Sequence, residues 1–321
     1  MTIADPLIVE SAERLFASLA QEGDFAKAWT KVEASGFLDI LAERSGELPA
    51  SNAFAVARVS GQFAIALPIV ETMIVRAALP GAVRKDLVGA LTLAQAGPSD
   101  AVLAAVPWAR NAHAVLFEDG SGSALVRKGA FCVDEGIAYG GDPRDTIRFE
   151  ASGVERLQEP HALHLLGTAA AMRVAQMSGA IDALLAMTVR YAADRHQFGR
   201  PIGSFQSVQH IIATLASDAE AASTAATLAV RGFDAGNISV IAAAKARAGD
   251  AAAAAAKKAH QVHGAIGLTA EHSLHRFSTR LLTWSQEFGT TAFWRRELGT
   301  MVVQRGGVRL WPWVASGGAT S

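Results

Sequence analysis

The residues best suited to chemistry lie on a short connection between two helical patterns. The connection reads Arg195-His-Gln-Phe-Gly199, Arg-Pro-Ile-Gly203, then Ser-Phe-Gln206. It combines a guanidinium (Arg195), an aromatic ring (Phe198) and an amide (Gln206), a set that suits an anionic, planar ligand. An ordinary turn between two helices remains an alternative, because Gly and Pro punctuate most such turns.

Two further segments follow in order. The first is Gln261-Val-His-Gly-Ala-Ile-Gly267, and the second is Phe288-Gly-Thr290, with Thr269, Glu271 and Leu274-His-Arg276 between them. Gln261 followed by a glycine allows the backbone to approach a ligand closely. Together with the spacing Arg-x-x-Phe-Gly-x-x-Ile-x-x-Phe-Gln, these segments resemble the C-terminal helical domain of flavin-dependent acyl-CoA dehydrogenases over residues ~155 to 305.

The resemblance implies a cofactor. In that family, the pyrophosphate and adenine of FAD are held across a subunit interface, and the flavin ring lies in the neighbouring chain. The resemblance therefore implies cofactor-binding roles for Arg195, Gln197, Phe198, Gln206, Gln261, Gly264 and Ala265. Ala265 stands where the family has a second glycine, which leaves somewhat less room for the ligand.

The catalytic base is the main departure from the family pattern. The family's reaction removes a proton α to a thioester carbonyl while a hydride leaves the β carbon for the flavin, so it requires a carboxylate base. Family members usually place a glutamate immediately before Gly-Thr, where this chain has Phe288. Others place it on the helix before the arginine corner, where this chain has only Asp182. Glu287 is a weak candidate, because one residue on a helix turns a side chain by about 100°. We therefore predict no catalytic residue in this chain.

Composition limits the possible classes of protein. With 321 residues, 50% hydrophobic and 18% charged, the chain can bury a large core in two or three compact units. A net charge of -1 gives no field for nucleic acid or an anionic membrane. The single Cys132 excludes an internal disulfide framework. The amino terminus lacks the basic and apolar regions of a secretory signal, and charged residues interrupt every long apolar segment. We expect a cytoplasmic protein with no membrane span.

The periodicity predicts a mostly α fold with a small β domain (α+β). Apolar residues at helical spacing predict an N-terminal helical domain at residues 1–85. Short apolar runs between turn signals predict a reduced middle antiparallel β domain at 86–153. Within it, Ala96-Gly-Pro-Ser-Asp100 is a faint match to the family's loop against the flavin ring, and we assign it no role.

The remaining chain predicts a C-terminal helical bundle at 154–305, a four-helix bundle in the resembled family, and a tail at 306–321. One apolar stripe reaches Tyr191. Later helices are expected from Phe205 past Leu228, from Ile238 to Lys258 and from Leu274 to Trp294. Lys245, Arg247, Asp250 and Lys257 are expected on an exposed face of the Ala-rich helix. The tail carries Trp311-Pro-Trp313, which suggests either docking on a neighbour or a frayed terminus.

Histidines are frequent in this region, namely His196, His210, His260, His263, His272 and His275. No carboxylate joins them at ligand spacing, so we interpret them as packed or solvated and predict no metal site.

These features favour the smaller subunit of an α2β2 heterotetrameric acyl-CoA dehydrogenase, as known in bacterial steroid side-chain degradation. The larger subunit would supply the base, the substrate would be an acyl-CoA, and an electron-transfer flavoprotein would accept the electrons. One alternative is a self-sufficient homo-oligomeric enzyme that uses Glu287. Another is a non-catalytic scaffold of the same fold, which the cofactor-binding residues speak against.

Overall fold

The computed structural model describes residues 4–43, 49–95, 101–157, 163–269, 271–307 and 310–315. The chain divides into two compact units. One comprises residues 1–57 and 65–169, and the other comprises residues 58–64 and 170–321. The segment Ala96–Asp100 and the end of the tail lie outside the described residues.

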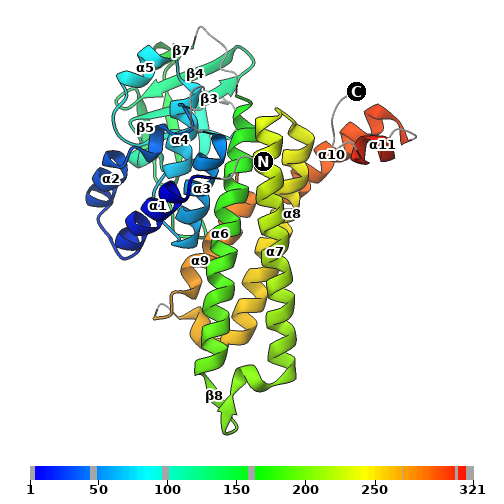
Figure 1. Ribbon diagram of the computed structural model, residues 1–321. Helices are drawn as coiled ribbons and strands as arrows, with labels where there is room; N and C mark the ends of the chain where they lie inside the picture. Colours follow the sequence, from blue (N-terminus) through cyan, green and yellow to red (C-terminus); the bar gives the residue numbers. More distant parts are fainter. Residues whose placement is uncertain are drawn as a thin grey trace. The chain divides into compact units, whose positions relative to one another are not determined.

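Helices open the first unit, as the periodicity predicts (Figure 1). They are α1 (Pro6–Leu19), α2 (Phe25–Ala34), η1 (Phe37–Asp39), α3 (Ala50–Gln62), α4 (Ile69–Ala78) and α5 (Gly81–Lys85). Helix α1 begins at Pro6 because the Asp5 carboxylate accepts a hydrogen bond from the Leu7 amide at 2.9 Å. Helix α3 passes from this unit into the second one after residue 57.

The rest of the first unit is a small β region. Its strands are β1 (Leu91–Leu93), β2 (Val102–Pro107), β3 (Ala114–Asp119), β4 (Gly122–Arg127), β5 (Phe131–Asp134), β6 (Arg144–Phe149) and β7 (Val154–Arg156), with η2 (Ala109–Asn111) and η3 (Ala151–Gly153) between strands. They form two sheets, with strand orders β1-β3-β4-β7 and β2-β6-β5. Side chains from both sheets share one buried core, which includes Leu103, Phe117, Val126 and Ile147.

Two details of this region differ from the expected antiparallel pattern. Strand β1 pairs with β3 in parallel, whereas the other pairs are antiparallel. Strand β2 was not among the expected runs. Its register shifts between Leu103 and Val106, and Ala105 has a φ of +54°, so a bulge interrupts the alternation that would have revealed the strand.

Helices dominate the second unit. They are α6 (Leu165–Asp194, whose first residues belong to the first unit), α7 (Gln206–Asp234), α8 (Ile238–His263), α9 (Leu274–Gln286), α10 (Thr291–Arg305) and α11 (Leu310–Ala315). Helix α8 packs against α7, α9 and α10. Small residues permit this packing: a Cβ on Gly249 of α8 would lie 2.3 Å from Thr291 Oγ1. None of the described helices is long and apolar enough to cross a membrane.

The expected single helix from Leu274 to Trp294 is wrong, because the chain forms α9 and α10 with a break between them. Phe288 and Gly289 have positive φ values of +52° and +91°. Thr290 then caps α10, its hydroxyl accepting a hydrogen bond from the Phe293 amide at 3.0 Å. Glu287 is therefore in an extended conformation outside either helix, and a helical rotation of 100° does not describe its position.

The expected exposure of Lys245 is also wrong, because its side chain is fully buried. Arg247 and Lys257 on the same helix are exposed as expected. Carbonyl groups at the end of α9 accept hydrogen bonds from the buried Lys245 nitrogen, which offsets its loss of contact with water.

Candidate functional site

The arginine corner is a short β-hairpin at the end of α6. Strand β8 (His196–Gln197) pairs with β9 (Arg200–Pro201), and the Ile202 amide donates to the Arg195 carbonyl at 2.7 Å. Phe198 and Gly199 have φ values of +53° and +78°, the pattern of a two-residue turn whose twist matches the strands. The turn places Phe198 at the tip, where its side chain is 91% exposed.

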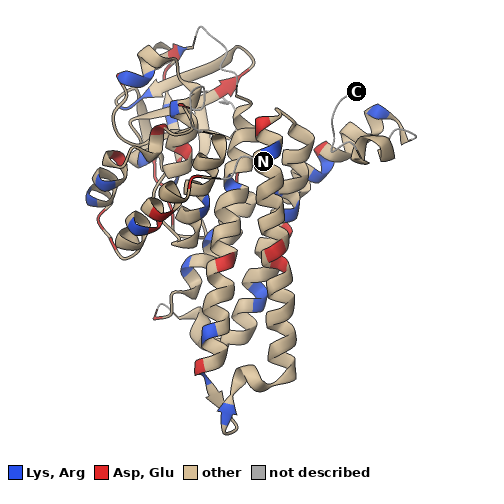
Figure 2. Ribbon diagram, viewed as in Figure 1, with Lys and Arg blue, Asp and Glu red and all other residues tan. Residues whose placement is uncertain are grey.

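Aromatic and cationic groups surround this hairpin. After η4 (Ile202–Ser204), Phe205 makes an edge contact with Phe198 at 6.1 Å between ring centroids, and the Arg200 guanidinium lies 4.2 Å above the Phe205 ring. Arg195 is exposed, and its guanidinium makes no ion pair with any described residue. Figure 2 shows basic residues at this end of the bundle. The exposed Arg195 guanidinium, together with the Arg200 guanidinium and the aromatic rings on the same connection, suits an anion that carries a planar ring.

Helix α7 adds polar groups beside the hairpin. Its first residue is Gln206, which is exposed. An open groove of about 630 Å³ runs along the first turns of α7, lined by Gln206, Ser207, Gln209, His210 and Ala213. The groove begins at the amino terminus of a 29-residue helix, where unpaired backbone N–H groups favour negative charge.

The second predicted segment lies at the end of α8. Gln261, Gly264 and Ala265 are all exposed, and the last two belong to η5 (Gly264–Leu268). Gly264 has a φ of +63°, and a Cβ placed there would meet no heavy atom within 4 Å. The backbone at this turn is therefore open to close approach by a ligand.

An aromatic contact brings the two segments to the same end of the bundle. The Tyr191 hydroxyl at the end of α6 donates to the His263 carbonyl at 3.3 Å, and the two rings stack with centroids 4.3 Å apart. All seven residues predicted to bind the cofactor lie on segments that this contact joins, namely Arg195, Gln197, Phe198, Gln206, Gln261, Gly264 and Ala265.

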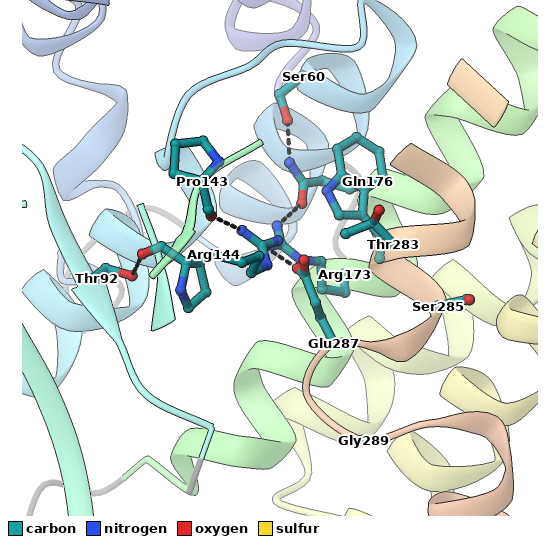
Figure 3. Close-up of polar contacts among 12 residues, drawn as sticks. Ser60, Thr92, Pro143, Arg144, Arg173, Gln176, Thr283, Ser285, Glu287 and Gly289 are labelled. Carbon is teal, nitrogen blue, oxygen red and sulfur yellow. Dashed lines mark hydrogen bonds and ion pairs between the residues drawn. The ribbon is translucent and has the colours of Figure 1, made fainter. Parts of the chain in front are cut away.

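Glu287, the weak candidate for a base, is held by a buried arginine (Figure 3). Its Oε2 atom accepts from Arg173 Nε at 2.8 Å and lies 2.7 Å from Arg173 Nη2. Arg173 is only 2% exposed, and it also donates to the Gln176 amide oxygen. The Gln176 amide in turn donates to the Ser60 hydroxyl at 3.0 Å. The sequence pattern did not predict this network, although Arg173 is the only cation between residues 165 and 189 of α6.

Further contacts fix the segment around Glu287. The Arg173 guanidinium lies 5.2 Å from the Phe288 ring centroid and 5.8 Å from that of Trp284. Lys245 Nζ donates to three carbonyl oxygens, of Gly289 at 2.9 Å, Ser285 at 3.1 Å and Trp284 at 3.3 Å. Burial, together with the nearby charge of Arg173, lowers the pKa of Lys245 to about 7.

Asp182, the acidic residue in the middle of α6, also forms an ion pair. Its Oδ2 atom lies 2.6 Å from Arg58 Nη2. Burial raises the pKa of Asp182, and the Arg58 charge opposes that shift. Both acids near the family's two base positions are therefore engaged in ion pairs.

The histidines of this end make packing contacts. His260 Nε2 lies 2.8 Å from the Ser278 hydroxyl, and His263 packs between Tyr191 and His272. Across the described ranges, no group of three or more His, Cys, Asp or Glu residues is placed to hold a metal ion.

Comparison with known proteins relates this arrangement to acyl-CoA dehydrogenases. Residues 160–302 match the family model for the acyl-CoA dehydrogenase C-terminal domain. The acyl-CoA dehydrogenase IpdE2 of Mycobacterium tuberculosis is 30% identical over 224 residues, covering 57% of this chain and 64% of that protein. IpdE2 of Mycolicibacterium smegmatis is 39% identical over 128 residues, covering 36% of each chain. The chain thus matches less than two thirds of the length of these relatives.

Solved structures extend the likeness to nearly the whole fold. The structure described as a Tcur3481-Tcur3483 steroid ACAD G363A variant has a TM-score of 0.83 at 21% identity, covering 93% of this chain and 97% of that one. The ChsE4-ChsE5 complex from Mycobacterium tuberculosis has a TM-score of 0.79 at 21% identity, covering 94% and 99%. Residues 160–302 therefore match an acyl-CoA dehydrogenase C-terminal domain, and the chain has the fold of the acyl-CoA dehydrogenases.

Proposed function

We propose that this chain is a subunit of a flavin-dependent acyl-CoA dehydrogenase and contributes the half-site for the pyrophosphate and adenine of FAD. The observation that carries the proposal is the gathering of the hairpin, the start of α7 and the Gly264 turn at one end of the bundle. An unpaired guanidinium, exposed amides and an open glycine turn are the groups that a dinucleotide requires.

The residues fit the cofactor in chemical terms. Arg195 supplies the charge for phosphate, and Gln206 and Gln261 supply amide groups that can donate and accept. Phe198 offers an exposed ring, and Gly264 leaves space for the ligand beside the backbone. FAD, when bound, supplies the electron-accepting chemistry, while these residues bind and orient it.

A larger partner supplies the base in this proposal. Glu287 forms an ion pair with Arg173, and Asp182 forms one with Arg58. Neither of these two carboxylates can therefore abstract a proton without breaking an ion pair. A homo-oligomeric enzyme that used Glu287 would first have to release it from Arg173. The name of the ChsE4-ChsE5 complex gives a precedent in the same fold for assembly with a different chain.

The same comparison supports a proposal for the substrate class. We propose the α,β-dehydrogenation of an acyl-CoA, with a steroid side-chain thioester as the substrate, because a structure of the same fold is described as a steroid ACAD. An electron-transfer flavoprotein then reoxidises the flavin.

Replacement of Arg195 tests the half-site. In the complex with the larger partner, Arg195→Ala should release FAD, because an exposed phosphate contact is lost without a cavity in the core. We expect the affinity for FAD to fall by at least tenfold, about 1.4 kcal/mol, with an unchanged thermal midpoint of the FAD-free protein.

The matched control is Arg14→Ala, which removes an exposed arginine from α1 in the other unit. Affinity measured by flavin fluorescence should be unchanged in this control. Full retention of FAD by Arg195→Ala at low cofactor concentration would show that the proposed role of Arg195 is wrong.

A further inference from the structure

We propose that Tyr191, His263 and His272 form a three-ring cluster that positions the Gly264 turn for FAD, so that cofactor affinity depends on the neutral state of the cluster. The inference rests on the proposed function, since it concerns the same half-site. It adds three positioning residues that contact the backbone or side chains next to the proposed cofactor-binding segments.

The geometry joins the two halves of the site through rings. Tyr191 stacks on His263 at 4.3 Å, and its hydroxyl holds the carbonyl of the residue immediately before Gly264. His272 makes edge contacts with His263 at 4.8 Å and with Tyr191 at 6.1 Å. The cluster thus connects the end of α6, the end of α8 and the segment before α9. Because the Tyr191 hydroxyl binds the backbone of the turn, loss of Tyr191 would free the turn that carries Gly264.

Burial and the lack of a partner for one ring nitrogen favour the neutral form of His263. His263 Nδ1 lies 2.8 Å from the Ala259 carbonyl, so this nitrogen carries the proton and donates it. His263 Nε2 is buried and has no hydrogen-bond partner among the described residues. His272 Nδ1 accepts from the Leu274 amide at 3.1 Å, which places the proton of His272 on its other nitrogen. A second proton on His263 would therefore add a buried charge and an unpaired donor.

The surrounding groups give the direction of the pH dependence. Tyr191 faces His263 from α6, and His272 faces it from the segment before α9. His260, on the same helix as His263, interacts with it electrostatically. Burial lowers the pKa of His263 below its ordinary value of 6.5, the hydrogen bond to the Ala259 carbonyl opposes that shift, and the two other histidines add to it. Just below pH 6.5, His263 in the folded protein therefore binds fewer protons than His263 in a disordered chain, so acid weakens the cluster and alkali leaves it intact.

The exposed His196 and His210 lie on the hairpin and on the first turns of α7, outside the cluster. Any effect of theirs on FAD affinity is common to the wild-type protein and a His263 variant. The contribution of the cluster is therefore the difference between the wild-type protein and a variant that cannot titrate at residue 263.

The experiment measures FAD affinity of the assembled complex between pH 5.5 and 8. Tyr191→Leu removes a ring and should weaken binding by about tenfold at pH 7, whereas Tyr191→Phe keeps the ring and should weaken it by about threefold. His263→Phe keeps the stack and removes the titrating group. At pH 7 the affinity of this variant for FAD should lie within about threefold of the wild-type value. Below about pH 6.5 its affinity should fall less than that of the wild-type complex.

The matched control is Tyr139→Leu, which removes the chain's other tyrosine, an exposed side chain in the first unit. Hydrogen exchange of amides 264–269 in the FAD-free complex should rise in Tyr191→Leu and stay unchanged in Tyr139→Leu. If Tyr191→Leu fails to fold, Tyr191→Phe and the pH profile of His263→Phe decide the question.

The outcomes separate this inference from the proposed function. If Arg195→Ala loses FAD while the Tyr191 variants retain wild-type affinity, the half-site stands and the positioning role is wrong. Equal pH profiles of the wild-type and His263→Phe complexes would overturn the role of His263. If Arg195→Ala retains FAD, the proposed function fails and this inference fails with it.

Discussion

Glu287 is held in an ion pair with a buried arginine, which bears on the role of its carboxylate. The sequence places it one residue before the family's base position, and the structure pairs it with Arg173, which is almost completely buried. An ion pair at this depth holds the carboxylate in place, and breaking it leaves a buried charge without its partner.

We predict that Glu287→Gln in the assembled enzyme changes kcat by less than about tenfold, or 1.4 kcal/mol of barrier. The same variant should lower the free energy of unfolding by about 1–3 kcal/mol, because the neutral amide binds the Arg173 guanidinium more weakly. Turnover with an artificial electron acceptor and urea unfolding measure the two effects. Glu297→Gln, a partly exposed acid on α10, is the control and should change neither. A collapse of turnover with FAD still bound would make Glu287 the base.

At this scale, the sequence predicts the types of binding residues and leaves their partners open. Motif spacing and the family resemblance predict cofactor-binding roles for Arg195, Gln206 and Gln261, because the family's motifs occur in order along the chain. Arg173 and Lys245 were not assigned their roles, since both contact residues more than thirty positions away and leave no local pattern. A cation within a helix whose neighbours are small or apolar was the available signal.

At the scale of the element, glycines determine how closely the helices pack. Gly249 of α8 faces Thr291 of α10, and an added methyl group would overlap with the threonine hydroxyl. We predict that Gly249→Ala lowers the free energy of unfolding by about 1–3 kcal/mol through overpacking. Gly299→Ala on α10 is the matched control, because a Cβ there meets nothing within 4 Å. Thermal unfolding should show a loss for Gly249→Ala and a small gain for Gly299→Ala. Equal midpoints for the two variants would contradict the close contact.

A second prediction at this scale concerns Lys245, which binds the break between α9 and α10, and the dependence of protein stability on pH. Lys245 has a pKa of about 7 in the folded protein and its ordinary value of 10.5 when unfolded. Between these values the folded state binds fewer protons, so the free energy of unfolding rises with pH. Below about pH 7 both states are protonated, and this slope disappears.

We therefore predict that Lys245→Met removes this slope, as measured by urea unfolding from pH 6 to 9.5. The difference between the two proteins isolates Lys245 from other titrating groups. Lys257→Met, an exposed lysine on the same helix, should retain the wild-type slope. Identical slopes in the wild-type protein and Lys245→Met would mean that folding does not lower the pKa of Lys245.

Periodicity predicts the long elements well and the short ones poorly. The helices from Pro6 to residue 78 and the long helices α6 to α8 were expected, because their apolar stripes extend over many turns. The hairpin at Phe198 and the bulged strand β2 were not, because each depends on positive φ values at residues other than glycine. Such residues follow local hydrogen bonding and packing, and their type does not reveal the turn.

At the scale of the whole molecule, the central claim is that the chain provides half of a flavin site in a complex with a different chain. The exposed Arg195 and the Gly264 turn at one end of its bundle and its two paired acids support that claim, and the family resemblance identifies the cofactor. Cofactor stoichiometry in the purified protein tests the claim most directly.

The measurement compares this chain expressed alone with the same chain co-expressed with a larger acyl-CoA dehydrogenase subunit, by native mass and flavin absorbance. We predict that the chain expressed alone is colourless or unstable. The co-expressed chains should form a yellow α2β2 tetramer with one FAD per pair of unlike chains. A stable homo-oligomer with one flavin per chain would contradict it.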